Sequence, residues 1–172
     1  MAEKWLLECL NGTKKLYLTH GHLDTVRKGK PLKEVALKLR VYLTCPVLSY
    51  RDALASVVFS THKLAVERLR WVDHGRPTVA RHCRLCRLCE GTVETPEHAL
   101  LQCDSSAMII QLWQDFLEKV WSAHPQAVTL YRMGDPMEFL RWLLGQEKIV
   151  LLLGKFTYRV LQEFYSYPLY RP

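Results

Sequence analysis

The sequence has no long hydrophobic run, no internal repeat and no low-complexity tract. Its longest uninterrupted apolar stretch, Ile149 to Leu153, is far shorter than the ~20 residues that a membrane-spanning helix needs. The first thirty residues lack the pattern of a secretory signal peptide. We therefore expect no membrane association and an intracellular protein, nuclear or cytoplasmic, whose cysteines are reduced.

The 172 residues are 49% apolar, which is enough for one compact domain or two small ones with a core that needs no disulfides. The formal net charge of +7 is unevenly placed. Residues 1–90 hold 17 Lys and Arg against 8 Asp and Glu, whereas residues 91–172 hold 7 against 9. A basic half attracts polyanions, so the imbalance favours nucleic acid or an acidic partner. Charge alone is equally consistent with a solvated basic face that binds nothing.

Apolar residues recur every three to four positions along nearly the whole chain, and no segment has a persuasive strand pattern. We therefore expect a mainly α fold, a small helical bundle. We expect three helices in the first half, the first of them basic and amphipathic, and three in the second half: 31–44, 50–59, 61–72, 109–121, 136–144 and 146–164.

Several of these helices have recognisable ends. Ser49 and Asp52 resemble a capping box before residue 50, and the polar pair at 60–61 predicts the start of the next helix. Asp135 followed by Pro136 predicts a later start, and Gly145 predicts its stop.

One cluster of cysteines and histidines has the composition of a metal-binding site. Four of the six cysteines fall within 21 residues, together with two histidines: Cys83, Cys86, Cys89, Cys103, His82 and His98. In an intracellular chain, CxxC followed by His and Cys is a metal-ligand pattern. We interpret Cys86 and Cys89 as the first ligand pair, and His98 with Cys103 as the second. Three thiolates and one imidazole predict a closed tetrahedral Zn²⁺ site that is structural and leaves no open position for catalysis.

The local pattern also predicts how the second pair is presented. Thr95 is a suitable N-cap and Pro96 a suitable first residue for a short helix through about Gln102. His98 and Cys103 would lie about 140° apart on a regular helix, so we expect the helix to loosen or end at Cys103.

Two alternatives stay open for the ligand set. Cys83 and Cys86 also form a CxxC, so the first pair can slide by three residues, and His82 is a further candidate ligand. Cys9 and Cys45 stand alone in apolar stretches and are expected to be core residues.

The string from Cys86 to Cys103, CRLCEGTVETPEHALLQC, followed by Trp113, resembles the zinc-binding segment of non-LTR retrotransposon reverse transcriptases. That family's pattern is CxxC, then Glu-Thr-x-x-His, then Cys, and every position is met here. The preceding residues 64–71 are similar to fungal copies. The resemblance is specific over residues 60–121, faint over 15–59 and absent after about 122.

The resemblance implies a nucleic-acid-handling accessory with ligands Cys86, Cys89, His98 and Cys103. The six aspartates are nowhere adjacent, so we expect no polymerase activity and a stand-alone C-terminal fragment of such an element. We expect a basic helical region (1–80), a zinc-binding knuckle (81–104) and C-terminal amphipathic helices (105–172). The expected partner is RNA or DNA, and the candidate contacts are Arg68, Arg70, Arg81, Arg84 and Arg87. The alternative is a zinc-stabilised protein-interaction module in which the Trp113/Trp121 stripe or the C-terminal helix docks a partner.

Overall fold

The computed structural model describes Leu18, residues 39–72 and residues 75–171. The fold is mainly helical, as predicted, and the described residues contain no named strand; Leu85 and Val93 form an isolated bridge. In chain order the elements are η2 (Val41–Thr44), α2 (Leu48–Val58), α3 (Ala65–Arg68), η3 (Arg81–Cys83), α4 (Pro96–Leu101), α5 (Ala107–Ala123), α6 (Ala127–Met133), α7 (Pro136–Leu144), η4 (Glu147–Ile149) and α8 (Val150–Tyr165).

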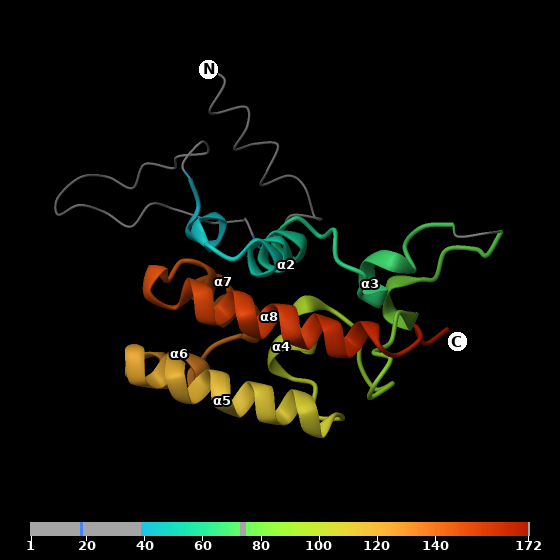
Figure 1. The fold of residues 1–172 in the computed structure, drawn as a ribbon. Helices are drawn as coiled ribbons and strands as arrows, with labels where there is room; N and C mark the ends of the chain where they lie inside the picture. Colours follow the sequence, from blue (N-terminus) through green and yellow to red (C-terminus); the bar gives the residue numbers. More distant parts are fainter. Residues whose placement is uncertain (1–17, 19–38, 73–74, 172) are drawn as a thin grey trace, which may run out of the picture.

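Helix α8 is the centre of the bundle and packs against both α2 and α5 (Figure 1). Phe116 of α5 stacks on Phe156 of α8 with ring centroids 4.3 Å apart, and Tyr50 of α2 meets Tyr158 at 5.6 Å. Helix α4 packs against α7 and α8, so one hydrophobic core joins the segments before and after the knuckle. No helix among the described residues is long and apolar enough to cross a membrane.

Helices α2 and α8 approach closely at Gly154, which is buried. A Cβ atom built there would lie 2.9 Å from the Cβ of Tyr50 and 3.2 Å from the Sγ of Cys45. Alanine favours a helix by about 1 kcal/mol over glycine, but a Cβ in this position forces the two helices apart.

We expect Gly154→Ala to lower the free energy of unfolding by about 1–3 kcal/mol, because overpacking outweighs the gain in helix propensity. Urea denaturation followed by circular dichroism measures the change. Gly145→Ala is the matched control, since Gly145 is exposed and an added Cβ meets only the carbonyl of Trp142 at 3.5 Å. Equal effects at both positions would contradict the packing argument.

The predictions for the second half are confirmed. Helix α5 covers the predicted stripe and buries Phe116 and Val120 among others. Helix α7 begins at Pro136, where the Asp135 carboxylate accepts a hydrogen bond from the Met137 amide, and it ends before Gly145. The helix predicted over 146–164 begins with a 3-10 turn, η4, and continues as α8 to Tyr165.

Two helix starts in the first half were predicted wrongly. Helix α2 begins at Leu48 with no side-chain cap, so Ser49 and Asp52 form no capping box. Ser60 (φ 52°) and Thr61 end α2 instead of starting a new helix: their amides donate to the carbonyls of Val57 and Ser56, which is a Schellman motif. Helix α3 begins only at residue 65 and lasts one turn.

The other expectations for the first half can be compared with the structure only where their residues are described. Positions 31–38 of the predicted basic helix lie outside them, and its end forms the 3-10 turn η2 instead of an α-helix. Val72, the last residue of the expected helix 61–72, lies beyond α3 and is 69% exposed. Cys45 is buried in the core as predicted, whereas Cys9 lies outside the described residues.

Candidate metal centre

The four predicted ligands converge. The Sγ atoms of Cys86, Cys89 and Cys103 and a ring nitrogen of His98 all lie within 4.8 Å of one another. The Cys86 and Cys103 sulfurs are 3.8 Å apart, and the Cys89 sulfur is 3.4 Å from His98 Nε2. Around a tetrahedral Zn²⁺, bonds of about 2.3 Å to sulfur and 2.0–2.1 Å to nitrogen give edges of about 3.8 Å between two sulfurs and about 3.5 Å between sulfur and nitrogen. The four side chains are therefore spaced to hold one metal ion.

A tight turn presents the first pair. The bridge between Leu85 and Val93 closes the turn, and the Cys86 amide donates to the carbonyl of Thr92 at 2.7 Å. The Glu90 amide donates back to the Cys86 carbonyl at 2.9 Å, with Glu90 in the left-handed region (φ 53°). This geometry turns both thiols of the CxxC toward the same point.

Helix α4 presents the second pair as predicted. Thr95 caps it by accepting a hydrogen bond from the His98 amide at 3.3 Å, and Pro96 is its first residue. The helix ends at Leu101, and the Cys103 amide donates to the His98 carbonyl at 2.8 Å. Because Cys103 lies beyond the last helical residue, its thiol can turn back toward His98.

The protonation of the cluster depends on its internal contacts. A hydrogen bond with Cys103 and then burial raise the pKa of Cys86 to about 12, and the same hydrogen bond lowers the pKa of Cys103. Burial alone lowers the pKa of His98, but the sulfurs of Cys86 and Cys89 outweigh it, so the net pKa is raised. At neutral pH an arriving metal ion must therefore displace the proton of Cys86.

The imidazole of His98 has a further polar contact. The Thr92 hydroxyl lies 3.1 Å from Nδ1 and 3.3 Å from Nε2. The hydroxyl is thus nearly equidistant from the two ring nitrogens and lies beside the imidazole within the same cluster.

Cys83 and His82 do not join the cluster. Cys83 lies in η3 and is half-buried, and the His82 side chain is exposed. Among residues 39–72 and 75–171, the only group of histidine, cysteine or acidic side chains placed to share an ion is the predicted set of four. The register that begins at Cys86 is thus the one that the fold brings together.

Arg87 has a structural role, which does not support its prediction as a nucleic-acid contact. Its side chain is 4% exposed and forms an ion pair with Glu94, which is fully buried. The remaining donors reach the backbone of α8 and the loop before α3: Nη1 donates to the carbonyls of Phe164 and Tyr167, and Nη2 to that of Lys63.

Glu94 is the residue that sequence reasoning missed. Its carboxylate accepts hydrogen bonds from the amides of Ala65 at 2.7 Å and Arg87 at 2.8 Å, besides the Arg87 guanidinium. The Glu94 carboxylate therefore joins the knuckle to the first turn of α3. The signal was present, because Glu94 is the acidic residue of the Glu-Thr-x-x-His pattern, but no role was assigned to it.

The other predicted arginines divide into two groups. Arg84 donates through Nε to the Val79 carbonyl and through Nη1 to the Val66 carbonyl, so it too has a structural role. Arg68, Arg70 and Arg81 are exposed. The predicted basic surface is thus reduced to these three residues.

Comparisons with protein-family models, with curated proteins and with solved structures find no match for this chain. The resemblance to the retrotransposon segment therefore depends on the residues of the motif alone. Those residues include the four that form the candidate metal centre and the buried carboxylate of Glu94.

Proposed function

We propose that this chain is a zinc-binding module that binds nucleic acid and has no polymerase activity, of the kind found after the polymerase in non-LTR retrotransposon reverse transcriptases. The observation that carries the proposal is the convergence of Cys86, Cys89, His98 and Cys103. These are the positions that the family's pattern assigns to the metal, and Glu94 of the same pattern supports them from inside the fold.

Zinc is the ion that best fits these donors. Three thiolates and one imidazole in tetrahedral arrangement are typical of structural Zn²⁺ sites, and four protein ligands leave no coordination position for water or substrate. The carboxylates nearest in sequence do not compete: Glu94 is paired with Arg87, and Glu97 is outside the cluster. The site therefore supports a fold and not a reaction.

Nucleic acid is the partner that the charge favours. Residues 1–90 carry a formal charge of +9, and the three exposed arginines of the predicted set lie close together in sequence before the knuckle. The alternative of a protein-docking module needs the stripe of α5 or the C-terminal helix α8 to be free, but both pack inside the bundle. Trp113 contacts Tyr131 of α6, with ring centroids 5.9 Å apart. Of the large apolar side chains in the stripe, only Trp121 is exposed, with 36% of its surface accessible.

A fluorescence anisotropy titration of the zinc-loaded chain with RNA and DNA tests the proposal. If three arginines each release a counterion, raising the salt from ~50 to ~200 mM weakens binding about 20- to 40-fold. We expect the double variant Arg70→Gln/Arg81→Gln to flatten the salt dependence by about 1.5 in the slope of log K against log salt.

The matched control removes two exposed cations from the other end of the chain, Arg132→Gln and Lys148→Gln, and should leave the slope unchanged. Absence of binding to either nucleic acid at ~50 mM salt, by a folded chain that holds zinc, would exclude the proposed function. Salt-independent self-association in light scattering would favour the protein-docking alternative.

A further inference from the structure

An exposed tryptophan stands among the arginines that precede the knuckle. Trp71 is 60% exposed, although tryptophan is the side chain with the largest apolar area to bury. The guanidinium of Arg70 lies over its ring, with the Cζ atom 5.3 Å from the centroid. Arg70 is also paired with Glu67 at 3.6 Å, so its position beside the ring is held from the α3 side.

The loop that carries Trp71 is fixed at its base. The Val79 amide donates to the Leu69 carbonyl at 2.9 Å. The Arg84 side chain links the end of the loop to α3, because it donates to the carbonyl of Val79 at 2.9 Å and to that of Val66 at 2.6 Å. The base of the loop is therefore tied to α3 and to the knuckle, and the loop projects from the α3 end of the molecule (Figure 1).

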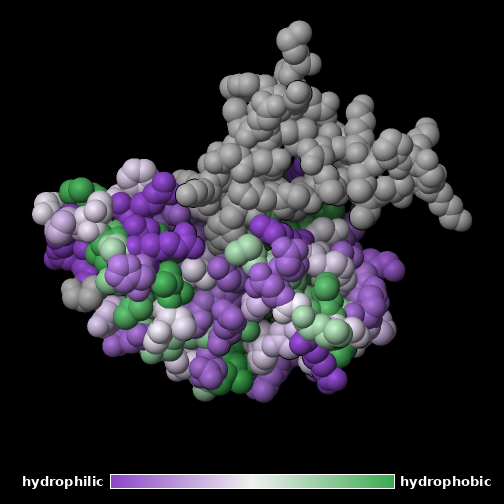
Figure 2. All heavy atoms as spheres, turned by 180° about the vertical axis from the view of Figure 1, so that it is seen from behind, coloured by the Kyte–Doolittle hydropathy of each residue, from purple (hydrophilic) through white to green (hydrophobic). Residues whose placement is uncertain are grey.

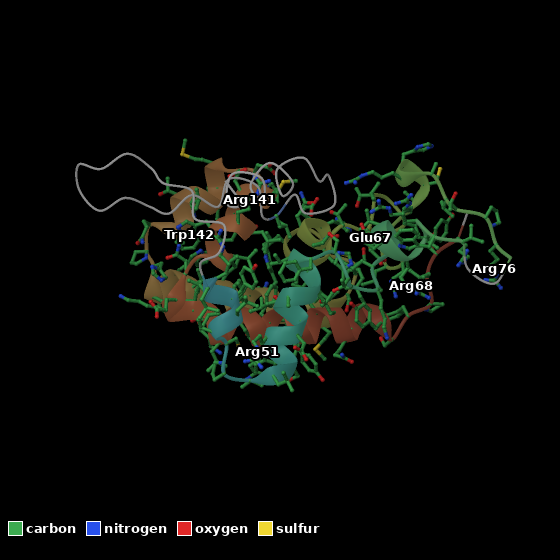
Figure 3. The ribbon with its side chains drawn as sticks, turned by 90° about the horizontal axis from the view of Figure 1, so that it is seen from above. Arg51, Glu67, Arg68, Arg76, Arg141 and Trp142 are labelled. Carbon is green, nitrogen blue, oxygen red and sulfur yellow. The ribbon has the colours of Figure 1, made fainter. Side chains whose placement is uncertain are left out.

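The surroundings of Trp71 are strongly basic. Residues 68–84 contain five arginines and one aspartate, and Arg76 and Arg81 are exposed. Arg68 and Arg76 lie at the same end of the molecule, with Arg76 on the projecting loop (Figure 3). Hydrophilic and hydrophobic side chains both lie on the surface of this end, which is at the left of Figure 2.

We infer that Trp71 is a stacking platform for single-stranded nucleic acid. The inference rests on the proposed function and adds the strand type and the contact residue. A base offers its flat face to the indole. Arg70, which lies over the ring, and the exposed Arg76 and Arg81 of the same basic segment supply cations for the phosphates of the strand. A protein partner would need an apolar or acidic surface to match, and an exposed ring beside Arg70 in a segment of five arginines and one aspartate favours the polyanion. A duplex keeps its bases stacked on one another and has no free face to give.

The test compares the full zinc-loaded chain with Trp71→Ala and Trp71→Phe. The probes are fluorescein-labelled oligo(U) and oligo(dT) of about 12 nucleotides, with a labelled duplex of the same length. We expect Trp71→Ala to weaken binding of both single strands about tenfold and duplex binding less than twofold, and Trp71→Phe to retain most of the affinity. Trp121→Ala, which removes an exposed tryptophan on α5, should change neither.

The outcomes separate this inference from the proposed function. If the wild-type chain binds no probe, both fail. If it binds but Trp71→Ala binds single strands equally well, or if the duplex competes as effectively as the single strand, only the stacking platform fails. A preference between oligo(U) and oligo(dT) assigns RNA or DNA as the strand. Unchanged zinc content in each variant confirms that the fold is intact.

Discussion

Replacing Cys103 with serine is expected to abolish stoichiometric zinc binding and to lower the melting temperature by about 15 °C or more. The wild-type chain should carry one zinc ion per molecule. Structural zinc contributes about 10–16 kcal/mol in small zinc peptides, the same order as the whole stability of a domain. A loss of only about 5 kcal/mol already corresponds to the stated shift for a chain of this length.

The reason lies in what the knuckle contains without an ion. Apart from one isolated bridge and a few backbone hydrogen bonds, the described residues between η3 and α4 have no regular structure. The two sulfurs of Cys86 and Cys103 are buried side by side at 3.8 Å. An ion bonded to four side chains replaces these weak contacts, and its removal leaves the turn and the start of α4 without their common anchor.

Metal analysis of the purified variants and thermal melts followed by circular dichroism measure the effect. Cys83→Ser is the matched control, because Cys83 is three residues away and outside the cluster. It should keep one zinc ion and melt within about 2 °C of the wild type, as expected for a substitution away from packed features. Full zinc content in Cys103→Ser, or loss of zinc in Cys83→Ser, would contradict the assigned ligand set.

The cluster of candidate metal ligands could be predicted from the sequence because its determinants are local. CxxC geometry, the cap of Thr95 and the helix stop before Cys103 each depend on residues within a few positions of one another. The same is true of the helix that starts at Asp135 and Pro136. Local steric and capping rules decide such features before any tertiary contact forms.

The wrong or unsupported predictions concern features that depend on residues far apart in the sequence. Thr61 resembles a helix start in sequence, but its amide completes the end of α2. The α3 start is instead set by the Ala65 amide, which donates to Glu94, 29 residues away. The role of Arg87 depends on the carbonyl of Phe164, 77 residues away. From the sequence alone, Arg87 resembles a surface cation beside the cysteines, because its distant partner Phe164 cannot be identified there.

The second large effect concerns the buried ion pair of Arg87 and Glu94. We expect Glu94→Gln to lower the free energy of unfolding by about 3–5 kcal/mol, because it leaves the charge of Arg87 buried without compensation. The carboxylate is fully buried and accepts hydrogen bonds from Arg87 and from the first amide of α3. Its loss should therefore loosen three attachments together: the knuckle, α3 and the C-terminal end of α8.

Urea denaturation gives the magnitude, and an exposed ion pair supplies the control. Arg141 pairs with Glu138 on the surface of α7, where the Glu138 side chain is 58% exposed. Glu138→Gln should change stability by less than about 1 kcal/mol, since solvent screens such a pair. The contrast between two glutamate-to-glutamine changes isolates burial as the cause.

A double variant decides whether the pair acts through its charge. In Arg87→Met/Glu94→Gln neither charge remains, so we expect part of the stability lost in Glu94→Gln to return. Zinc content should stay at one ion per chain in both, because neither residue is a ligand. If the double variant is less stable than Glu94→Gln by the full cost of a second independent substitution, the two residues are not coupled. The hydrogen bonds of Arg87 to the α8 end would then be the main attachment of the knuckle to the bundle.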